Sequence, residues 1–386
     1  MRRGRLTGHV LRAYGGTSRL AWQSGDPPSA SADRRRYVIA HESSLPRIVA
    51  LATANPPYAF SQDEVCSLGG YDDPTRRALF AHSGVARRYL CIEPGHFSPR
   101  EDAQALHERY RKWSVALATE AAARCLATAG RDAGEIDLLV AASCTGYLCP
   151  GLDALLAKAL GTGRRLQRAN LIGMGCSAAL PALQRAWDHL HAHPRHRVLV
   201  VASEICSAAY FMDASLEMAV SHALFADGAA AALLEADGAA EGGVRLVDFE
   251  TLLETEHQDV MGFDMVEGRL RLVLSKDIRH LAPAVAGAMV AALLARHGLA
   301  RADIRHWVIH PGGRRVIEGV VAGLGLAEAD VAPARAVLRD YGNMSSPTIL
   351  FVLREALRQR PPATGDLGLM VSLGPGFAAE GALLQF

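Results

Sequence analysis

Short apolar segments alternate with longer helical patterns along most of this chain, and this alternation restricts the fold more than any other feature. Four runs have the length and apolarity of buried strands: residues 137–143, 197–205, 306–313 and 367–376. Apolar positions at helical spacing predict helices over residues 102–128, 177–191, 280–297 and 345–358. Fully apolar strands suit a sheet that is covered on both faces. The pattern therefore predicts a layered α/β architecture.

The size and charge of the chain narrow the class of protein. A length of 386 residues exceeds what one simple core usually supports, so two packed halves or one large duplicated domain are expected. The 41 basic and 40 acidic residues leave a net charge of +1, which argues against nucleic acid as the main partner. We expect no apolar run to approach the roughly 18 residues of a membrane span, and hence a soluble protein.

Seven cysteines are scattered singly, without a CxxC pair and without a secretory signal before them. This indicates a reducing, cytoplasmic setting without a disulfide framework. Residues 1–44 stand apart as a basic segment rich in Ser, Gly and Pro, which predicts a poorly ordered extension. The segment has the Arg and Ser of a transit peptide but no clear amphipathic helix, so we prefer a plain tail or an overextended gene start.

The stretch NLIGMGCSAALPAL, residues 170–183, places Cys176 in a glycine-spaced turn between an apolar run and a helical pattern. The free N–H groups and positive dipole end of a helix stabilise an anion, and a thiolate is such an anion. A free cysteine is also a common small core residue. On this stretch alone, both the nucleophile and the core residue are open interpretations.

Three further residues stand at strand ends or turns. His310 ends an apolar run before Pro-Gly-Gly, Asn343 lies between a glycine and a Ser-Ser-Pro helix start, and Phe225 precedes a small-residue run. Each has a plain structural interpretation as a surface, cap or core residue. Together with Cys176, however, a histidine and an amide can form a nucleophilic set. In such a set imidazolium stabilises the thiolate, and N–H groups polarise a thioester carbonyl or an enolate oxygen.

Six motifs follow one another in order: GMGCSAALPAL, LVVASEI, ALFADGAAA, WVIHPGG, YGNMSSPTILFVL and SLGPGFAAEGALL. In these motifs the chain resembles, from about Pro46 to Phe386, the type III polyketide synthases, the chalcone-synthase-like branch of the thiolase superfamily. A ketoacyl synthase of the III type shares Cys, His and Asn but usually differs after the histidine, so HPGG favours the former. The resemblance implies a five-layered α-β-α-β-α thiolase fold with two mixed five-stranded sheets. It implies two similar halves, residues 45–240 with the cysteine and residues 241–386 with the histidine and asparagine, in a homodimer.

The resemblance also implies roles for the four residues. Cys176 matches the nucleophile that accepts the starter acyl group and the growing chain. His310 and Asn343 match the pair that binds the thioester oxygen and stabilises the enolate formed when malonyl-CoA loses CO2. An Asn side chain is no general base, so its expected role is electrostatic. Phe225 matches the gate aromatic between the CoA tunnel and the cavity. Acyl-CoA and malonyl-CoA are the implied substrates, with no bound cofactor and no metal.

Several positions depart from the plant pattern and bear on the product. Cys144 stands where plant enzymes carry Thr, and Leu272 stands where they carry a second gate Phe. Ala209 falls at a usually polar cavity position, and Phe263 falls near a plant glycine. We expect these residues to line the cavity and to favour a medium or long aliphatic starter, giving an alkylpyrone or alkylresorcinol. Plain core packing is the alternative interpretation.

Other functions stay open at this point. A tetrahydroxynaphthalene-type synthase primed by malonyl-CoA and a single-extension enzyme like ketoacyl synthase III are the enzymatic alternatives. An inactive scaffold of the same fold is the non-enzymatic one, and the intact Cys, His and Asn disfavour it. Cys149 corresponds to a residue that reaches across the dimer into the partner's cavity, with packing beside Pro150 as the alternative.

Cations are needed for the phosphates of CoA. Arg76, Arg77, Arg314 and Arg315 are candidates because guanidinium forks suit phosphate oxygens, although an exposed Arg is usually plain surface. We expect Gly312 and Gly313 of the HPGG turn beside the substrate, since glycine lets another molecule approach the backbone closely. The histidine-rich tract at residues 189–196 lies at a predicted helix end without acidic or cysteine neighbours, so we expect no metal there.

Overall fold

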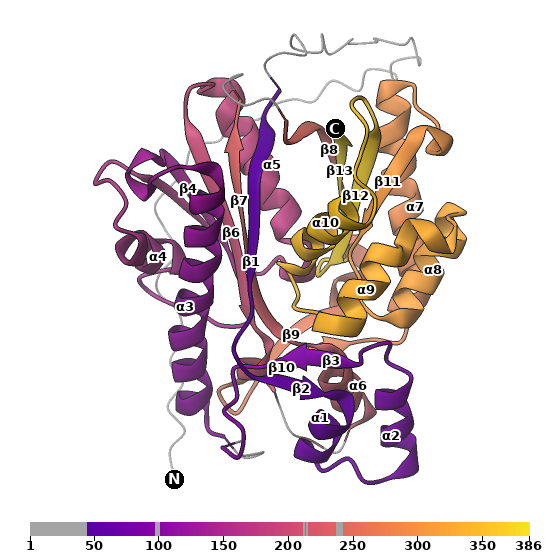
Figure 1. Ribbon diagram of the computed structural model, residues 1–386. Helices are drawn as coiled ribbons and strands as arrows, with labels where there is room; N and C mark the ends of the chain where they lie inside the picture. Colours follow the sequence, from indigo (N-terminus) through magenta and orange to yellow (C-terminus); the bar gives the residue numbers. More distant parts are fainter. Residues whose placement is uncertain (1–44, 97–100, 211–212, 214, 237–241) are drawn as a thin grey trace, which may run out of the picture. The chain divides into compact units, whose positions relative to one another are not determined.

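The computed structural model describes residues 45–96, 101–210, 213, 215–236 and 242–386, and every structural statement here concerns those residues. Nine strands form one mixed sheet in the order β11-β12-β13-β8-β1-β7-β6-β4-β5 (Figure 1). Their bounds are Arg47–Ala54 (β1), Leu138–Ala142 (β4), Gln167–Leu171 (β5), Arg197–Ile205 (β6), Asp227–Glu235 (β7), Val244–Leu253 (β8), Ile304–Ile309 (β11), Leu367–Gly374 (β12) and Ala378–Gln385 (β13). The four predicted strands are present as β4, β6, β11 and β12.

Helices connect most of the strands. Their bounds are Gln62–Leu68 (α1), Pro74–Ala81 (α2), Ala103–Ala129 (α3), Leu152–Leu160 (α4), Ala179–Ala192 (α5), Leu216–Leu224 (α6), Ile278–His297 (α7), Arg314–Leu324 (α8), Ala332–Tyr341 (α9) and Thr348–Gln359 (α10). The predicted helices correspond to α3, α5, α7 and α10, which confirms the alternation seen in the sequence.

The strand pattern repeats. β4 and β6 are parallel, β6 and β7 antiparallel, and β7 and β1 antiparallel. β11, β12, β13 and β8 follow the same directions in the same order. β1 and β8 pair only at Arg47–Arg245 and Ile48–Val244, so the two groups of strands separate beyond that point. The predicted construction from two similar halves is confirmed.

The expected pair of separate five-stranded sheets is wrong in detail. Among the described residues the first half contributes five strands, the second contributes four, and the two groups join at β1 and β8. In the second half, the segment before α10 forms only an isolated bridge, between Asn343 and Phe225 of the first half. A fifth strand is therefore replaced by a contact between the halves.

The helices form three layers around the two groups of strands. α3 packs on β1, β6 and β7, while α7 packs on β8, β12 and β13. α5 packs on β4 and β6 and reaches β13; α10 packs on β11 and reaches β1 and β7. α5 and α10 thus lie between the strand groups, as Figure 1 shows for α10. Every residue of β4 and β7 is buried because helices cover both faces. The predicted five-layered thiolase fold is confirmed.

One helix corrects an expectation about apolar length. α7 is 20 residues long and apolar enough, by length and composition only, to cross a membrane. Its buried residues, among them Val285, Met289 and Leu293, pack within the core against the strands of the second half. The apolar composition of α7 is therefore explained by its burial in the core of the second half.

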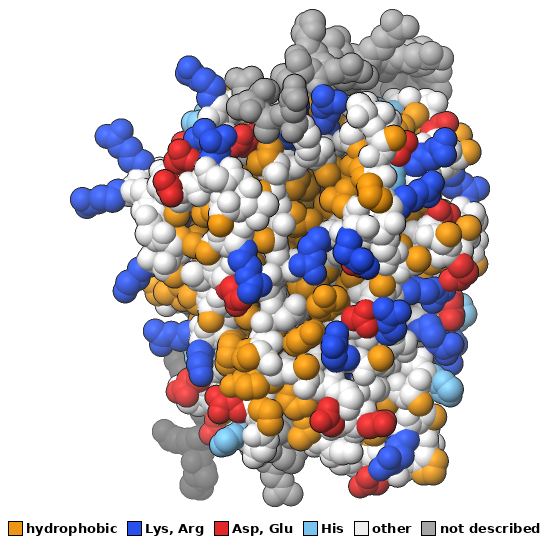
Figure 2. Space-filling model, in the orientation of Figure 1, with side chains coloured by type: hydrophobic (Ala, Val, Ile, Leu, Met, Phe, Trp, Pro, Cys, Tyr) orange, Lys and Arg blue, Asp and Glu red, His pale blue; other side chains and the backbone are white. Residues whose placement is uncertain are grey.

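Two small hairpins lie outside the large sheet. β2 (Ala59–Ser61) pairs with β3 (Arg87–Tyr89), and β9 (Met261–Val266) pairs with β10 (Arg269–Leu274). On the face drawn in Figure 2, basic side chains are scattered among acidic and apolar ones. The predicted extension at residues 1–44 and the predicted boundary at residue 240 lie outside the described residues. Both stay predictions.

Candidate active site

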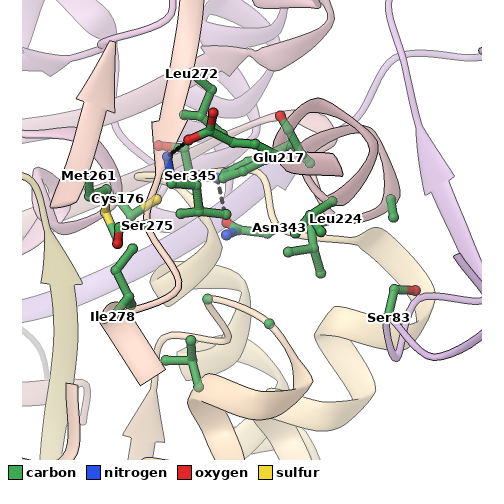
Figure 3. A pocket seen from close by; sticks show the side chains of 18 of the residues that line it. Ser83, Cys176, Glu217, Leu224, Met261, Leu272, Ser275, Ile278, Asn343 and Ser345 are labelled. Carbon is green, nitrogen blue, oxygen red and sulfur yellow. Dashed lines mark hydrogen bonds between the residues drawn. The ribbon is translucent and has the colours of Figure 1, made fainter. Parts of the chain in front are cut away.

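A cavity of about 910 Å³ is lined by residues of both halves. The first half contributes α2, α6 and the turn before α5; the second contributes β9, β10, the start of α8 and the turn before α10. Cys176, His310 and Asn343 all line it. Figure 3 shows Cys176 and Asn343 around this space together with Ser345 and Leu272. The structure thus brings the three predicted catalytic residues to one cavity.

Cys176 lies in a 3-10 turn, Gly175–Ser177, between β5 and α5. Gly175 has φ 53°, and a Cβ there would lie 2.4 Å from Cδ of Pro375, so only glycine fits this turn. The carbonyl oxygen of Cys176 accepts a 3.0 Å hydrogen bond from Oγ of Ser372 in the second half. The predicted strand–turn–helix is confirmed, and both halves fix the turn that carries the thiol.

The thiol of Cys176 is buried, with 8% of the residue exposed. Burial raises its pKa to about 11, and the negative charge of Glu204 acts in the same direction. Hydrogen bonds with the side chains of Ser345 and Asn343 lower the pKa by less. The protonated thiol is therefore the favoured form at neutral pH.

Asn343 is held in one orientation. Its Oδ1 accepts the backbone N–H of Ser345 at 2.8 Å and faces Oγ1 of Thr348 at 3.5 Å. Its backbone N–H donates to Leu224 and its carbonyl accepts from Ala226, both at 2.9 Å. Because both Oδ1 neighbours are donors, the side-chain NH2 group is the part left for a ligand.

His310 directly follows β11, and its backbone N–H donates to the carbonyl of Val371 at 2.8 Å. Burial lowers the pKa of its imidazole to about 3, so the ring is neutral at pH 7. Within the described part of the chain, neither buried ring nitrogen has a hydrogen-bond partner. A buried polar atom without a partner is rare, so the ring is arranged for a ligand in the cavity.

Glu204 is a site residue that the sequence interpretation missed. Oε2 of this fully buried carboxylate accepts N–H groups of Cys144 and Thr145 at 2.9 and 3.1 Å. Its Oε1 accepts Oγ of Ser346 at 2.6 Å. Burial raises the pKa of Glu204, and these hydrogen bonds oppose that shift. The sequence signal that could have indicated Glu204 is a single acidic residue in the apolar run RVLVVASEI, because a buried carboxylate needs hydrogen-bond partners.

Ser345 was missed as well. It has φ 60°, a left-handed conformation that is uncommon for serine and is often found at functional sites. Its Oγ lies 3.6 Å from Sγ of Cys144. The turn that carries Asn343 therefore also contacts Cys144, which was predicted to line the cavity.

Most of the other predicted binding residues line the cavity. They are Cys144, Ala209, Phe225, Phe263, Leu272, Gly312, Gly313, Arg314 and Arg315. Cys149 is exposed and is not among the lining residues of this chain. Arg76 and Arg77 do not line it either: they pair with Asp73 and Asp72 at 2.8 and 3.0 Å. Lys276 and Arg279, which the sequence interpretation missed, do line the cavity.

A buried thiol, a neutral imidazole and an oriented amide thus line one cavity at the junction of two thiolase-type halves, the arrangement that the resemblance to thioester-condensing enzymes implies. The family models for the N-terminal and C-terminal domains of chalcone and stilbene synthases match residues 101–238 and 249–386. The chain therefore belongs to the chalcone and stilbene synthase family. It is a type III polyketide synthase, an acyltransferase that catalyses decarboxylative condensation.

Individual relatives agree with this assignment. The chain is 37% identical to a 3,5-dihydroxyphenylacetyl-CoA synthase of Streptomyces toyocaensis, over 88% of this chain and 90% of the relative. It is 32% identical to an α-pyrone synthesis polyketide synthase-like protein of Mycobacterium tuberculosis, over 88% and 90%. The crystal structure of 1,3,6,8-tetrahydroxynaphthalene synthase from Streptomyces coelicolor matches with a TM-score of 0.82 and 26% identity, over 88% and 99%.

Proposed function

We propose that Cys176, His310 and Asn343 carry out the condensation in the cavity described above. Sγ of Cys176 attacks the carbonyl carbon of an acyl-CoA, its proton passes to the free ring nitrogen of His310, and the C–S bond to CoA breaks. The departing CoA thiolate takes that proton. The observation that carries this assignment is the pair of unpartnered ring nitrogens on a buried, neutral His310.

The extension step uses the same groups. Malonyl-CoA loses CO2, and the enolate oxygen that forms is held by an N–H of His310 and the NH2 group of Asn343. The enolate carbon attacks the acyl carbonyl, a C–C bond forms, and Cys176 leaves as thiolate. The fixed orientation of Asn343 supports this role, because its Oδ1 is already occupied by Ser345.

For the starter we propose a medium or long aliphatic acyl group, extended and cyclised to an alkylpyrone or alkylresorcinol. Ala209, Phe263 and Leu272 give the cavity apolar side chains along one wall. Each methylene buried there contributes about 0.8 kcal/mol, so a few carbons set a clear preference.

Malonyl-CoA as its own starter is the second candidate. The relative from Streptomyces toyocaensis is named for a product with a dihydroxylated ring and no alkyl tail, and this favours the second candidate. The tetrahydroxynaphthalene synthase among the structural neighbours favours it too.

Purified protein with labelled malonyl-CoA and a ladder of acyl-CoAs, from acetyl to hexadecanoyl, tests the proposal. Products should be identified by mass, and Cys176→Ala serves as the matched inactive variant. Higher kcat/KM for long starters supports the first candidate, and equal product without any added starter supports the second. No CO2 release under any condition would contradict both.

We propose that Lys276, Arg279 and Arg315 at the cavity bind the CoA phosphates, since each carries a donor-rich cation.

We also propose a homodimer. β5 ends the sheet order and is largely exposed, Ile172 directly after it is 54% exposed, and Tyr147 in the loop after β4 is 69% exposed. Unpaired edge strands with apolar neighbours are natural pairing sites. Sedimentation analysis should give the mass of two chains, and a monomer at micromolar concentration would contradict the dimer. The free thiols support a cytoplasmic location.

A further inference from the structure

The hairpin of β9 and β10 forms a wall of the cavity without belonging to the large sheet. In the described part of the chain its strands pair only with each other. Two of its cross-strand pairs, Phe263–Leu272 and Met261–Leu274, supply four lining residues of the cavity. An isolated two-stranded hairpin is marginally stable in water, so its position depends on contacts with neighbouring elements.

Glu217 in the first turn of α6 makes two of those contacts. Its Oε1 accepts the backbone N–H of Leu274 at 2.8 Å, and its Oε2 accepts Nη2 of Arg271 at 3.0 Å. The two bonded groups lie one residue before and two residues after Leu272 in β10. One carboxylate thus holds the strand on both sides of a cavity-wall residue. Figure 3 shows Glu217 and Leu272 at the cavity.

The surroundings explain why the carboxylate is paired. Glu217 itself lines the cavity beside apolar side chains, where an unpaired charge would be costly. Its side chain and that of Arg271 are 28% and 20% exposed, so water screens the pair only in part. Nε of Arg271 also bonds Asp213 at 3.0 Å, which keeps the guanidinium in place.

We propose that Glu217 is a positioning residue for acyl-chain length: it fixes Leu272 and Phe263 at the wall through Arg271 and the N–H of Leu274. The inference rests on the proposed function, namely that an acyl thioester extends in this cavity. With the hairpin fixed, the wall has one position and the cavity one depth. Without the contacts of Glu217, the wall shifts outward and longer chains fit.

Glu217→Gln is the informative variant. Glutamine keeps an oxygen that can accept the N–H of Leu274 but lacks the charge that binds Arg271. The matched control is Glu267→Gln, which removes an exposed ion pair with Arg269 in the same hairpin, away from the cavity lining. Arg271→Lys keeps the positive charge, whereas Arg271→Gln removes it.

We expect Glu217→Gln and Arg271→Gln to raise the ratio of kcat/KM for dodecanoyl-CoA over hexanoyl-CoA at least about tenfold, the discrimination that one or two methylenes allow in an apolar pocket. Glu267→Gln and Arg271→Lys should stay near the wild-type ratio. An unchanged ratio in both charge-removing variants would overturn the proposal, and so would an equal change in Glu267→Gln.

Hydrogen–deuterium exchange provides a readout that needs no turnover. Amides of residues 261–274 should exchange faster in Glu217→Gln than in the wild type and in Glu267→Gln, while the amides of β6 and β7 stay unchanged. If no acyl-CoA is extended by the wild type, the proposed function fails, whereas the contact of Glu217 with the hairpin is still tested by exchange. Equal exchange in all three proteins would overturn the positioning role.

Discussion

Oε1 of Glu204 in β6 accepts a 2.6 Å hydrogen bond from Oγ of Ser346 in the turn before α10, and this bond joins the two halves within the active site. Oε2 of the same carboxylate accepts the N–H groups of Cys144 and Thr145. Glu204 therefore fixes the turn of Cys144 and Thr145 in the first half relative to the turn of Asn343 in the second half.

Replacing Glu204 with alanine should destabilise the protein and reduce condensation. The two backbone N–H groups of Cys144 and Thr145 would be left buried without an acceptor, at a cost of about 1–3 kcal/mol each. Urea unfolding and CO2 release from malonyl-CoA measure the two effects. Glu256→Ala, at an exposed glutamate that does not line the cavity, is the control and should have a small effect. Wild-type stability in Glu204→Ala would contradict the role.

Alkylation of Cys176 by iodoacetamide should accelerate with pH. Burial raises its pKa to about 11 and lowers that of His310 to about 3, so both groups are neutral at pH 7. The thiolate fraction then rises about tenfold per pH unit below the thiol pKa. Peptide mass analysis after short exposures between pH 6 and 10 separates Cys176 from the exposed Cys149. A rate that is level from pH 6 to 8 would instead indicate a preformed thiolate–imidazolium pair.

Arg315→Ala should raise KM for acyl-CoA about three- to tenfold with little change in kcat, as expected for one charged hydrogen bond to a phosphate near solvent. The effect should shrink as ionic strength rises. Arg77→Ala is the control, because Arg77 pairs with Asp72 and does not line the cavity. Equal KM changes in the two variants would place the phosphates elsewhere.

Much of the fold and of the candidate site could be predicted because their signals are local. Apolar runs predicted β4, β6, β11 and β12, and the motifs around Cys176, His310 and Asn343 predicted residues that share one cavity. Contacts between distant residues left no such signal: Glu204 and Ser346 are 142 positions apart, and nothing in either motif indicates the pair.

The placement of Arg76 and Arg77 could have been predicted better. Asp73 precedes Pro74 at the start of α2 and accepts the backbone N–H of Arg76 as an N-cap. The stretch DDPTRR is therefore a helix start whose two arginines have acidic partners within five residues. The ion pairs of Arg76 and Arg77 could therefore be predicted from local spacing. The cations that line the cavity could be identified only from the fold.

Glu380→Gln should stabilise the protein at alkaline pH and not at acidic pH. Glu380 in β13 accepts Oγ1 of Thr251 at 2.5 Å, and burial raises its pKa from 4.5 to about 7. A raised carboxyl pKa favours the folded state below pH 4.5, and that contribution is lost as the pH rises through 7. Above pH 7 the difference approaches about 3 kcal/mol. Urea unfolding at pH 5, 6.5 and 8 measures it, with exposed Glu256→Gln as control. A pH-independent difference would contradict the assignment.

Ala209→Trp should shorten the acyl chain that the enzyme accepts or builds. Ala209 is 7% exposed and lines the cavity, so an indole ring there fills space that an aliphatic chain would otherwise occupy. Cys144→Trp should shorten the chain too, but at lower kcat, because Sγ of Cys144 contacts Oγ of Ser345 beside the reactive groups. Each methylene excluded removes about 0.8 kcal/mol of burial, so the preferred starter should become shorter by several carbons.

The acyl-CoA ladder with product masses measures both variants. Ala81→Trp is the matched control, because Ala81 is exposed on α2 and is not among the lining residues. If Ala209→Trp and Cys144→Trp both keep the wild-type chain-length profile, the aliphatic chain does not lie along this wall. In that case the apolar side chains there serve packing, and the chain must run along the opposite side of the cavity.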